Sequence, residues 1–172
     1  MREQSDIGYR LWQMLSNTCY LINKVRQKEL YHRGISLRYS AILHAILRLG
    51  TNATPIEIAR QSSRERHSIS EQISRMEKEG LVKKIRDLKR KNLVRVELTE
   101  KGRALFQETV NRESIEFIMS ELTWKEQREL WSLLVKLRRR TTEYHGIDGI
   151  RLFPPSNLEE LQSLEMDYQV NL

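Results

Sequence analysis

The sequence is poor in the residues that build covalent or metal-based sites. One cysteine, Cys19, among 172 residues excludes an internal disulfide and every metal site that needs several cysteines. The four histidines, at positions 32, 44, 67 and 145, lack the paired spacing of metal ligands. No glycine-rich phosphate loop and no nucleophile motif is found. We therefore expect no catalytic residues, no metal and no cofactor, and a protein that is not an enzyme.

Long apolar runs are also missing. No stretch approaches the roughly 20 apolar residues of a membrane-spanning helix, and no signal peptide opens the chain. We therefore expect a cytoplasmic protein without a membrane partner. Hydrophobic residues make up 39% of the chain and charged residues 31%, which indicates a modest core and much solvated surface.

The positive charge is concentrated in one part of the chain. The net charge of +7 and the pI near 9.7 favour a polyanionic partner. Residues 54–98 contain 12 lysines and arginines against 7 acids, whereas residues 145–172 contain 1 against 5. Positive charge concentrated in one segment indicates a specific basic surface more strongly than the net charge of the whole chain does.

The centre of the chain is typical of two helices joined by a turn. Thr54 and Pro55 suit the N-cap and the first helical position, and Glu57 is spaced to complete a capping box. Apolar residues four and three positions apart predict a second helix over 65–79, which Gly80 ends as the C′ residue just beyond it. The apolar stripe of this helix is Ile69, Ile73 and Met76, and its opposite side is His67, Ser70, Glu71, Ser74, Arg75 and Lys78.

A strongly basic segment follows the second helix. Between 83 and 95, seven lysines and arginines stand against a single acid, Asp87. Val94, Val96 and Leu98 alternate with charged residues, which is the period of a strand. A ribbon with so many cations suits a phosphate backbone, and a polar-faced helix beside it fits a major groove about 12 Å wide. The sequence therefore predicts a winged helix-turn-helix that binds double-stranded DNA.

Four stretches of this region carry a family pattern: Ile56-Glu57-Ile58-Ala59, Ile69 to Met76, Glu77-Lys78-Glu79-Gly80-Leu81-Val82, and Val96-Glu97-Leu98-Thr99-Glu100-Lys101-Gly102. The run from Thr54 to Ala104 that contains them resembles the multiple-antibiotic-resistance regulator (MarR) family of bacterial transcription factors. The last stretch is the most specific. The wing Asp-x-Arg usual in the family falls here on Arg90, Lys91 and Asn92, so no minor-groove arginine is carried over to Asn92.

The fold that we expect is mainly α with a small β-wing. It consists of an N-terminal dimerisation helix over 1–33, a winged helix-turn-helix region over 34–99, and C-terminal dimerisation helices over 100–172. Apolar residues recur every three or four positions over 6–30, 100–120 and 123–143, and an acidic helix with an apolar stripe is predicted from Ser156. The buried side predicted for the helix over 123–143 is Trp124, Leu130, Trp131, Leu134 and Leu137. These faces are more than one winged helix needs, which favours a homodimer over packing within one subunit.

The candidate DNA-binding residues lie in the second helix and at the wing tip. Arg66 is long enough to bind a guanine edge with two hydrogen bonds. Glu71 either accepts from a cytosine or pairs with Arg75 four residues on. The full set is Arg64, Arg66, His67, Ser68, Ser70, Glu71, Ser74, Arg75, Lys89, Arg90 and Lys91.

Two further sites follow from the resemblance. Relatives often bind small phenolic or aromatic effectors between the dimer helices and the helix that begins after Ser36, which implies an effector pocket near Tyr39, His44 and Arg48. Ordinary packing or solvated surface is the alternative for each. Some relatives sense peroxides through a cysteine in the first helix, as Cys19 could, whereas a small buried side chain is the alternative there.

The function that we expect is that of a homodimeric, sequence-specific DNA-binding transcriptional regulator. Repression is the commoner mode in the family, and a small effector would modulate binding to a pseudo-palindromic operator. Two alternatives stay open: a winged-helix module that binds another protein and not DNA, and a regulator that senses peroxide through Cys19.

Overall fold

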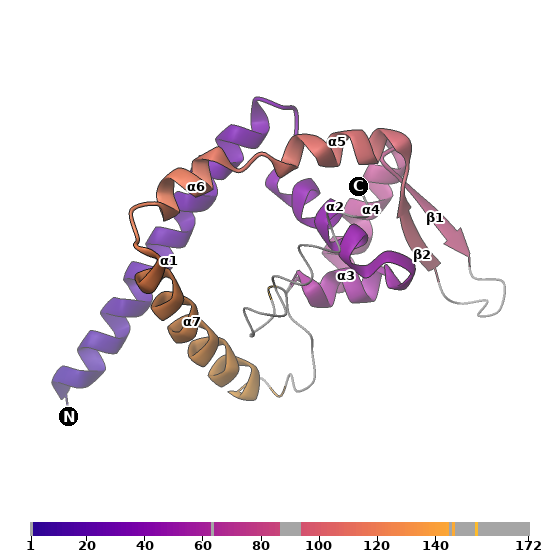
Figure 1. The fold of residues 1–172 in the computed structure, drawn as a ribbon. Coiled ribbons are helices and arrows are strands. Elements are labelled where there is room, and N and C mark those ends of the chain that lie inside the picture. The colour runs from indigo at the N-terminus through magenta and orange to yellow at the C-terminus, as the bar shows by residue number, and fades with distance from the viewer. Residues whose placement is uncertain (1, 63, 87–93, 145, 147–153, 155–172) are drawn as a thin grey trace.

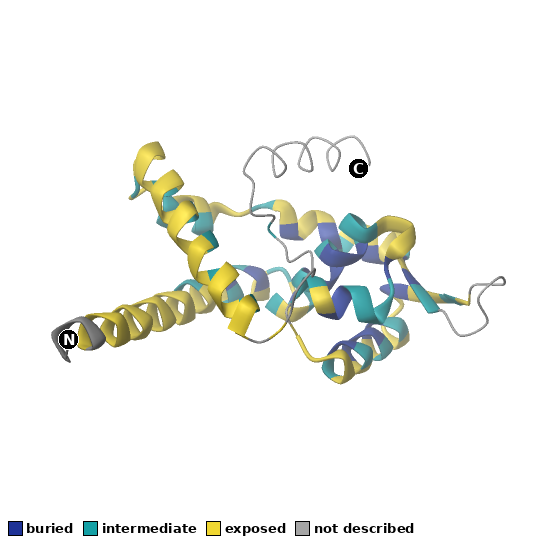
Figure 2. Ribbon diagram, turned by 90° about the horizontal axis from the view of Figure 1, so that it is seen from below, coloured by how far each residue is buried: buried dark blue, intermediate teal, exposed yellow. Residues whose placement is uncertain are grey.

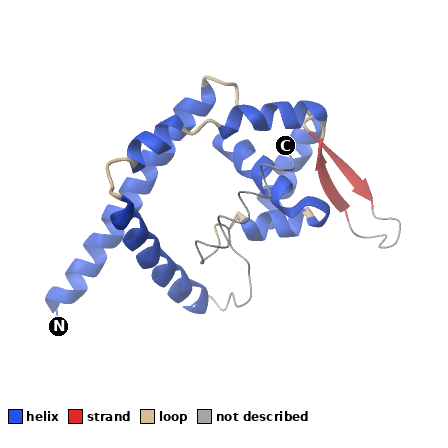
Figure 3. Cartoon of the chain, in the orientation of Figure 1, coloured by secondary structure: helices blue, strands red, loops and turns tan. Residues whose placement is uncertain are grey.

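The computed structural model describes residues 2–62, 64–86, 94–144, 146 and 154. It is mainly helical, with two strands (Figure 3), as the sequence predicts. The helix predicted from Ser156 lies outside the described residues. No helix in the described part of the chain combines the length and apolarity needed to cross a bilayer. The elements are α1 (Arg2–Tyr31), α2 (Leu37–Leu49), the 3-10 helix η1 (Gly50–Asn52), α3 (Pro55–Gln61), α4 (Arg66–Lys78), β1 (Val82–Arg86), β2 (Val94–Leu98), α5 (Glu100–Val110), α6 (Glu113–Met119) and α7 (Trp124–Tyr144).

The winged lobe, residues 37–110, has one hydrophobic core. Helices α2 to α5 surround it, and the two strands form an antiparallel ribbon in which Val82 pairs with Leu98 and Arg86 with Val94 (Figure 1). The Val96 N–H also donates to the Ala53 carbonyl, which fastens the ribbon to the turn before α3. The buried side chains that meet in this core include Ile42, Leu43, Ile46, Ile58, Ile69, Ile73, Met76, Val82, Val96 and Phe106.

Local signals explain where the helices of this lobe begin and end. The Thr54 hydroxyl accepts from the Glu57 N–H at 3.3 Å, as predicted for the N-cap of α3. The predicted return bond of the capping box is wrong, because the Thr54 N–H donates to the Asn52 carbonyl and the Glu57 carboxylate pairs with Arg60 at 2.5 Å. Gly80 ends α4 with a φ of 72°, a left-handed conformation that glycine adopts without strain.

The arm, made of α1, α6 and α7, has almost no core of its own. Helix α6 packs along α1 (Figure 1). Every residue from Asp6 to Leu21 is exposed, and α7 has no buried residue (Figure 2). The predicted buried side of α7 is therefore wrong for the single chain: Trp124 is 64% and Leu137 58% exposed, because no other element among the described residues covers them.

The single helix predicted over 100–120 is also wrong. The chain leaves helical geometry at Asn111, whose φ of −65° and ψ of 122° are extended, and α6 begins at Glu113. The Asn111 side chain stabilises the break, since its carbonyl oxygen accepts from the Glu113 N–H and its amide donates to the Glu113 carboxylate. A second cause is Arg26 of α1, which binds the carbonyls at the end of α5.

Candidate nucleic-acid interface

Helix α4 presents a polar face because its apolar stripe is fully used in the core. Ile69, Ile73 and Met76 are 0–2% exposed, as their spacing predicts. The candidate residues of α4 divide by exposure: Arg66, His67, Glu71 and Arg75 are exposed, whereas Ser68, Ser70 and Ser74 are partly buried. Arg64, just before the helix, is exposed as well.

An ion pair crosses the exposed face of α4. The Arg75 guanidinium lies 2.7 Å from the Glu71 carboxylate, so the pairing considered from the sequence does form. Both side chains are more than half exposed. An ion pair in water contributes only about 0–1 kcal/mol, and a phosphate or base can therefore compete for Arg75 at little cost.

Lys84 joins the ribbon to α4. Its Nζ lies 2.8 Å from the Glu77 carboxylate and 3.0 Å from the Ser74 hydroxyl, and the hydrogen bond from Lys84 lowers the pKa of Glu77. Lys83 pairs across the ribbon with Glu97 at 3.3 Å. Two of the cations that the sequence assigns to a phosphate clamp thus have acidic partners in the protein. Sequence reasoning missed the Lys84 contact, which joins residues on different elements.

The ribbon is attached to the end of α4 by a compact set of backbone contacts. The Thr99 hydroxyl donates to the Gly80 carbonyl at 2.6 Å and accepts from the Gly102 N–H at 3.0 Å. The Thr99 N–H donates to the Leu81 carbonyl. Gly102 lies so close to the residue before β1 that a Cβ on it would stand 2.0 Å from the Leu81 carbonyl oxygen. These contacts fix the junction of β2 and α5 against the turn between α4 and β1.

Known proteins share this arrangement over most of the chain. The sequence model of the MarR family matches residues 33–91. The organohalide-sensing transcriptional regulator RdhR-CbdbA1625, solved with bound 2,4-dichlorophenol, is 33% identical to this chain, with a TM-score of 0.77. That match covers 86% of this chain and 89% of the other. The chain belongs to the MarR family. No curated protein matches it significantly.

Two more distant MarR-family structures share the fold. A mutant of MarR from E. coli, complexed with operator DNA, is 21% identical over 74% of this chain and 93% of its own, with a TM-score of 0.69. AbsC from Streptomyces coelicolor is 19% identical over 80% of this chain and 96% of its own, with a TM-score of 0.72. MarR-family proteins are transcription regulators and not enzymes, and this chain is a transcriptional regulator with their winged-helix fold.

The three candidate effector residues of this MarR-family chain lie on α2 but have different neighbours. The Tyr39 hydroxyl donates to the Glu79 carboxylate at 2.8 Å, and burial together with this bond raises the pKa of Tyr39 to about 12. The His44 ring lies edge-on to Phe106, with centroids 4.8 Å apart, and burial lowers the pKa of His44 to about 3. Arg48 donates to the side-chain carbonyl of Gln61 on α3, at 3.3 Å. Tyr39 thus contacts the end of α4, whereas His44 faces α5.

The remaining candidate sites of this MarR-family chain are Cys19 and the wing tip. Cys19 is exposed, so the expectation of a buried side chain is wrong for the single chain, because none of the residues that the structure describes covers this part of α1. Lys24, a nearby cation, lies over the ring of Tyr20 at 5.7 Å from its centroid. The wing-tip residues Lys89, Arg90 and Lys91 lie outside the described residues, and their role stays a prediction.

Proposed function

We propose that the protein binds DNA as a homodimer whose two α4 helices enter successive major grooves of a pseudo-palindromic operator. The observation that carries this proposal is the exposed polar face of α4 beside an anchored basic ribbon. Such a helix fits a major groove, and two-fold dimers place recognition helices about 34–36 Å apart on DNA. A fold relative solved with operator DNA supports the same reading.

The apolar surface of the arm supports a second copy of the chain as the partner. On α1, Ile7, Leu11 and Met14 are 60–68% exposed, and on α7, Leu133 and Leu137 are 57–58% exposed. Large apolar side chains that recur in exposed positions along two helices are typical of an interface. Sedimentation at micromolar concentration should give a dimer, and removal of residues 1–30 should abolish specific DNA binding. A well-behaved monomer of the full chain would contradict the dimer.

A small phenolic or aromatic effector would modulate DNA binding, with repression as the expected mode. The support is the similarity to a regulator solved with 2,4-dichlorophenol. His44 and Arg48 are one helical turn apart on α2, and Arg48 is among the charges that lower the pKa of His44. A neutral imidazole can donate to or accept from a phenol hydroxyl. We expect the protein to act in the cytoplasm, where its operator lies.

A test of base recognition must distinguish the contribution of α4 to DNA binding from that of the ribbon. Arg66→Ala and His67→Ala should each weaken operator binding by about 1–3 kcal/mol, with nonspecific binding closer to that of the wild type. The operator would first be selected from a random DNA library, which also reports its symmetry and half-site spacing. Equal losses on operator and unrelated DNA would mean that α4 holds the backbone and that the bases are read elsewhere.

The wing supplies the complementary test. Replacing Lys89, Arg90 and Lys91 together by Ala should weaken binding to every DNA. It should also flatten the slope of log affinity against log salt by up to roughly 3, about 0.9 for each lost phosphate contact. An unchanged slope would remove the wing from the phosphate contacts. Absence of binding by the wild type to any DNA would favour the alternative function, a winged-helix module for protein partners.

A further inference from the structure

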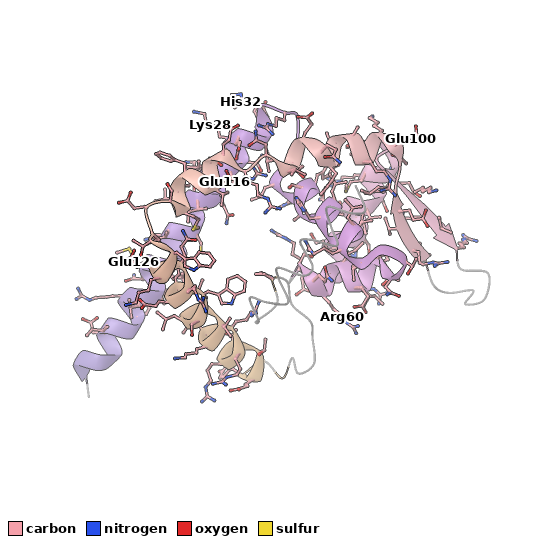
Figure 4. The ribbon with its side chains drawn as sticks, viewed as in Figure 1. Lys28, His32, Arg60, Glu100, Glu116 and Glu126 are labelled. Carbon is pink, nitrogen blue, oxygen red and sulfur yellow. The ribbon has the colours of Figure 1, made fainter. Side chains whose placement is uncertain are left out.

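The winged lobe and the arm meet where the chain passes from α5 to α6. Only two residues, Asn111 and Arg112, separate these helices, and α1 runs beside the break. Figure 4 shows Lys28 and His32 near the end of α1 that meets the lobe, with Glu116 on α6, which packs along α1. The chain also passes from arm to lobe between α1 and α2, where Leu30 and Ile35 are buried, so what holds Asn111 and Arg112 is one of two determinants of the angle between lobe and arm.

Arg26 of α1 holds the end of α5. Its Nη2 donates to the Thr109 carbonyl and its Nη1 to the Asn111 carbonyl, both at 2.7 Å. The side chain is only 10% exposed. The last carbonyls of a helix have no N–H partner within it, and the planar fork of arginine can bind two of them in fixed directions at once. The guanidinium thus replaces the N–H donors that a continuous helix would supply.

Glu29, one turn further along α1, holds the start of α6. It pairs with the Arg26 Nη1 at 2.6 Å and accepts both from the Ser114 hydroxyl and from the Ser114 N–H. Burial would raise the pKa of Glu29, but the bonds from Ser114 and Arg26 outweigh it and keep the pKa below its usual value. One ion pair on α1 therefore fixes both sides of the break.

We propose that Arg26, oriented by Glu29, is a positioning residue that sets the angle between winged lobe and arm, and with it the half-site spacing that the dimer accepts. This inference rests on the dimeric DNA-binding function proposed above. If the arms join the two copies, each α4 is separated from the interface by this break, and a small rotation there moves the two recognition helices apart. Rigid positioning lowers the entropy cost of binding two half-sites together.

The experiment compares Arg26→Lys with the wild type on operators whose half-sites are one or two base pairs closer or further apart. Lysine keeps the charge but lacks the fork. We expect the affinity ratio between the best spacing and a spacing one base pair longer to fall by about tenfold, which corresponds to about 1.4 kcal/mol. Affinity for unrelated DNA should stay within about threefold of wild type, because the basic surface is intact. An unchanged spacing profile in a folded dimer would overturn the proposal.

Arg33→Met is the matched control. Arg33 also donates to a carbonyl of α5, that of Glu108 at 2.8 Å, but this bond is exposed and lies before the break. The variant loses an arginine-to-carbonyl bond without freeing Thr109 or Asn111, so its spacing profile should match that of the wild type. A control that broadens the profile as much as Arg26→Lys would also overturn the proposal.

Ser114→Ala carries the test if Arg26→Lys does not fold. It removes only the hydroxyl bond to Glu29, so we expect a smaller broadening of the spacing profile, and an unchanged profile would count against the proposal. A measurement without DNA separates this inference from the proposed function. Nitroxide labels at Arg103→Cys in a Cys19→Ser chain report the distance between the two lobes by double electron–electron resonance. The distance distribution should broaden with Arg26→Lys even if the wild type binds no DNA, and an unchanged distribution would overturn the hinge.

Discussion

Replacing Gly102 by alanine sets two physical effects of opposite sign against each other. Gly102 is buried in the first turn of α5. In a helix, alanine is more favourable than glycine by about 1 kcal/mol. Here, however, the added Cβ would stand 2.0 Å from the oxygen and 3.0 Å from the carbon of the Leu81 carbonyl. That carbonyl is backbone and accepts from Thr99, so it cannot turn aside as a flexible side chain could.

The steric effect should prevail. Inserting a methyl group into a packed site typically destabilises by about 1–3 kcal/mol, and an approach of 2.0 Å belongs at the upper end of that range. After subtraction of the helix-propensity gain, a net loss of about 1–2 kcal/mol remains. At roughly 2–4 °C for each kcal/mol in a chain of this size, the melting temperature should fall by about 2–8 °C. Because the clash would displace the Leu81 backbone, to which Thr99 at the end of β2 is bonded, it should also weaken operator binding.

Gly8→Ala is the control of opposite sign. Gly8 is helical, in α1, and a Cβ there would meet nothing within 4 Å. Alanine should therefore stabilise the chain by about 0.5–1 kcal/mol. Thermal and urea unfolding of both variants at one protein concentration provide the measurement. If Gly102→Ala were as stable as the wild type or more stable, the close packing of α5 on the Leu81 backbone would be refuted.

Three further predictions concern single side chains. Burial lowers the pKa of His44 from 6.5 to about 3, so on acidification the unfolded chain binds a proton at His44 before the folded chain does. The free energy of unfolding should therefore fall as the pH drops from about 6.5 towards 3. Urea titrations of His44→Gln should lack this pH-dependent component. Lys84→Gln should change the slope of log affinity against log salt by much less than the roughly 0.9 expected for one phosphate contact, because Lys84 is paired with Glu77. A loss of the full ~0.9 would show that Lys84 contacts a phosphate. Cys19→Ser should keep both operator binding and the effector response in gel-shift assays, whereas loss of the response would favour peroxide sensing.

Signals that act within one helical turn could be predicted from the sequence. Ser36 accepts from the Tyr39 N–H, and Thr123 and Glu126 form the complete capping box that their spacing indicates. Gly80 ends the recognition helix as predicted, with its N–H bonded to the Glu77 carbonyl. Each of these features depends on residues three or four positions apart, so a single sequence contains the whole cause.

Features that depend on distant residues could not be predicted in this way. The periodicity over 100–120 continues through Asn111, and the break there depends in part on Arg26, which is 85 residues away along the chain. The pairing of Lys84 with Glu77 likewise depends on how the ribbon folds back over α4. The polar face of α4 was predictable because its apolar stripe is periodic, whereas the partners of its side chains were not.

Because the arm is exposed, the folding of α1 and α7 should depend on protein concentration. A helix gains most of its stability from packing, yet α1 is exposed at every position from Asp6 to Leu21, and no residue of α7 is fully buried in the part of the chain that the structure describes. If a second copy supplies the missing contacts, folding of the arm and association are one equilibrium. The melting temperature would then rise with protein concentration, and at the lowest concentrations proteases would cut α1 and α7 before the winged lobe. In a cell that makes few copies, only the dimerised fraction of this regulator would be protected from proteolysis.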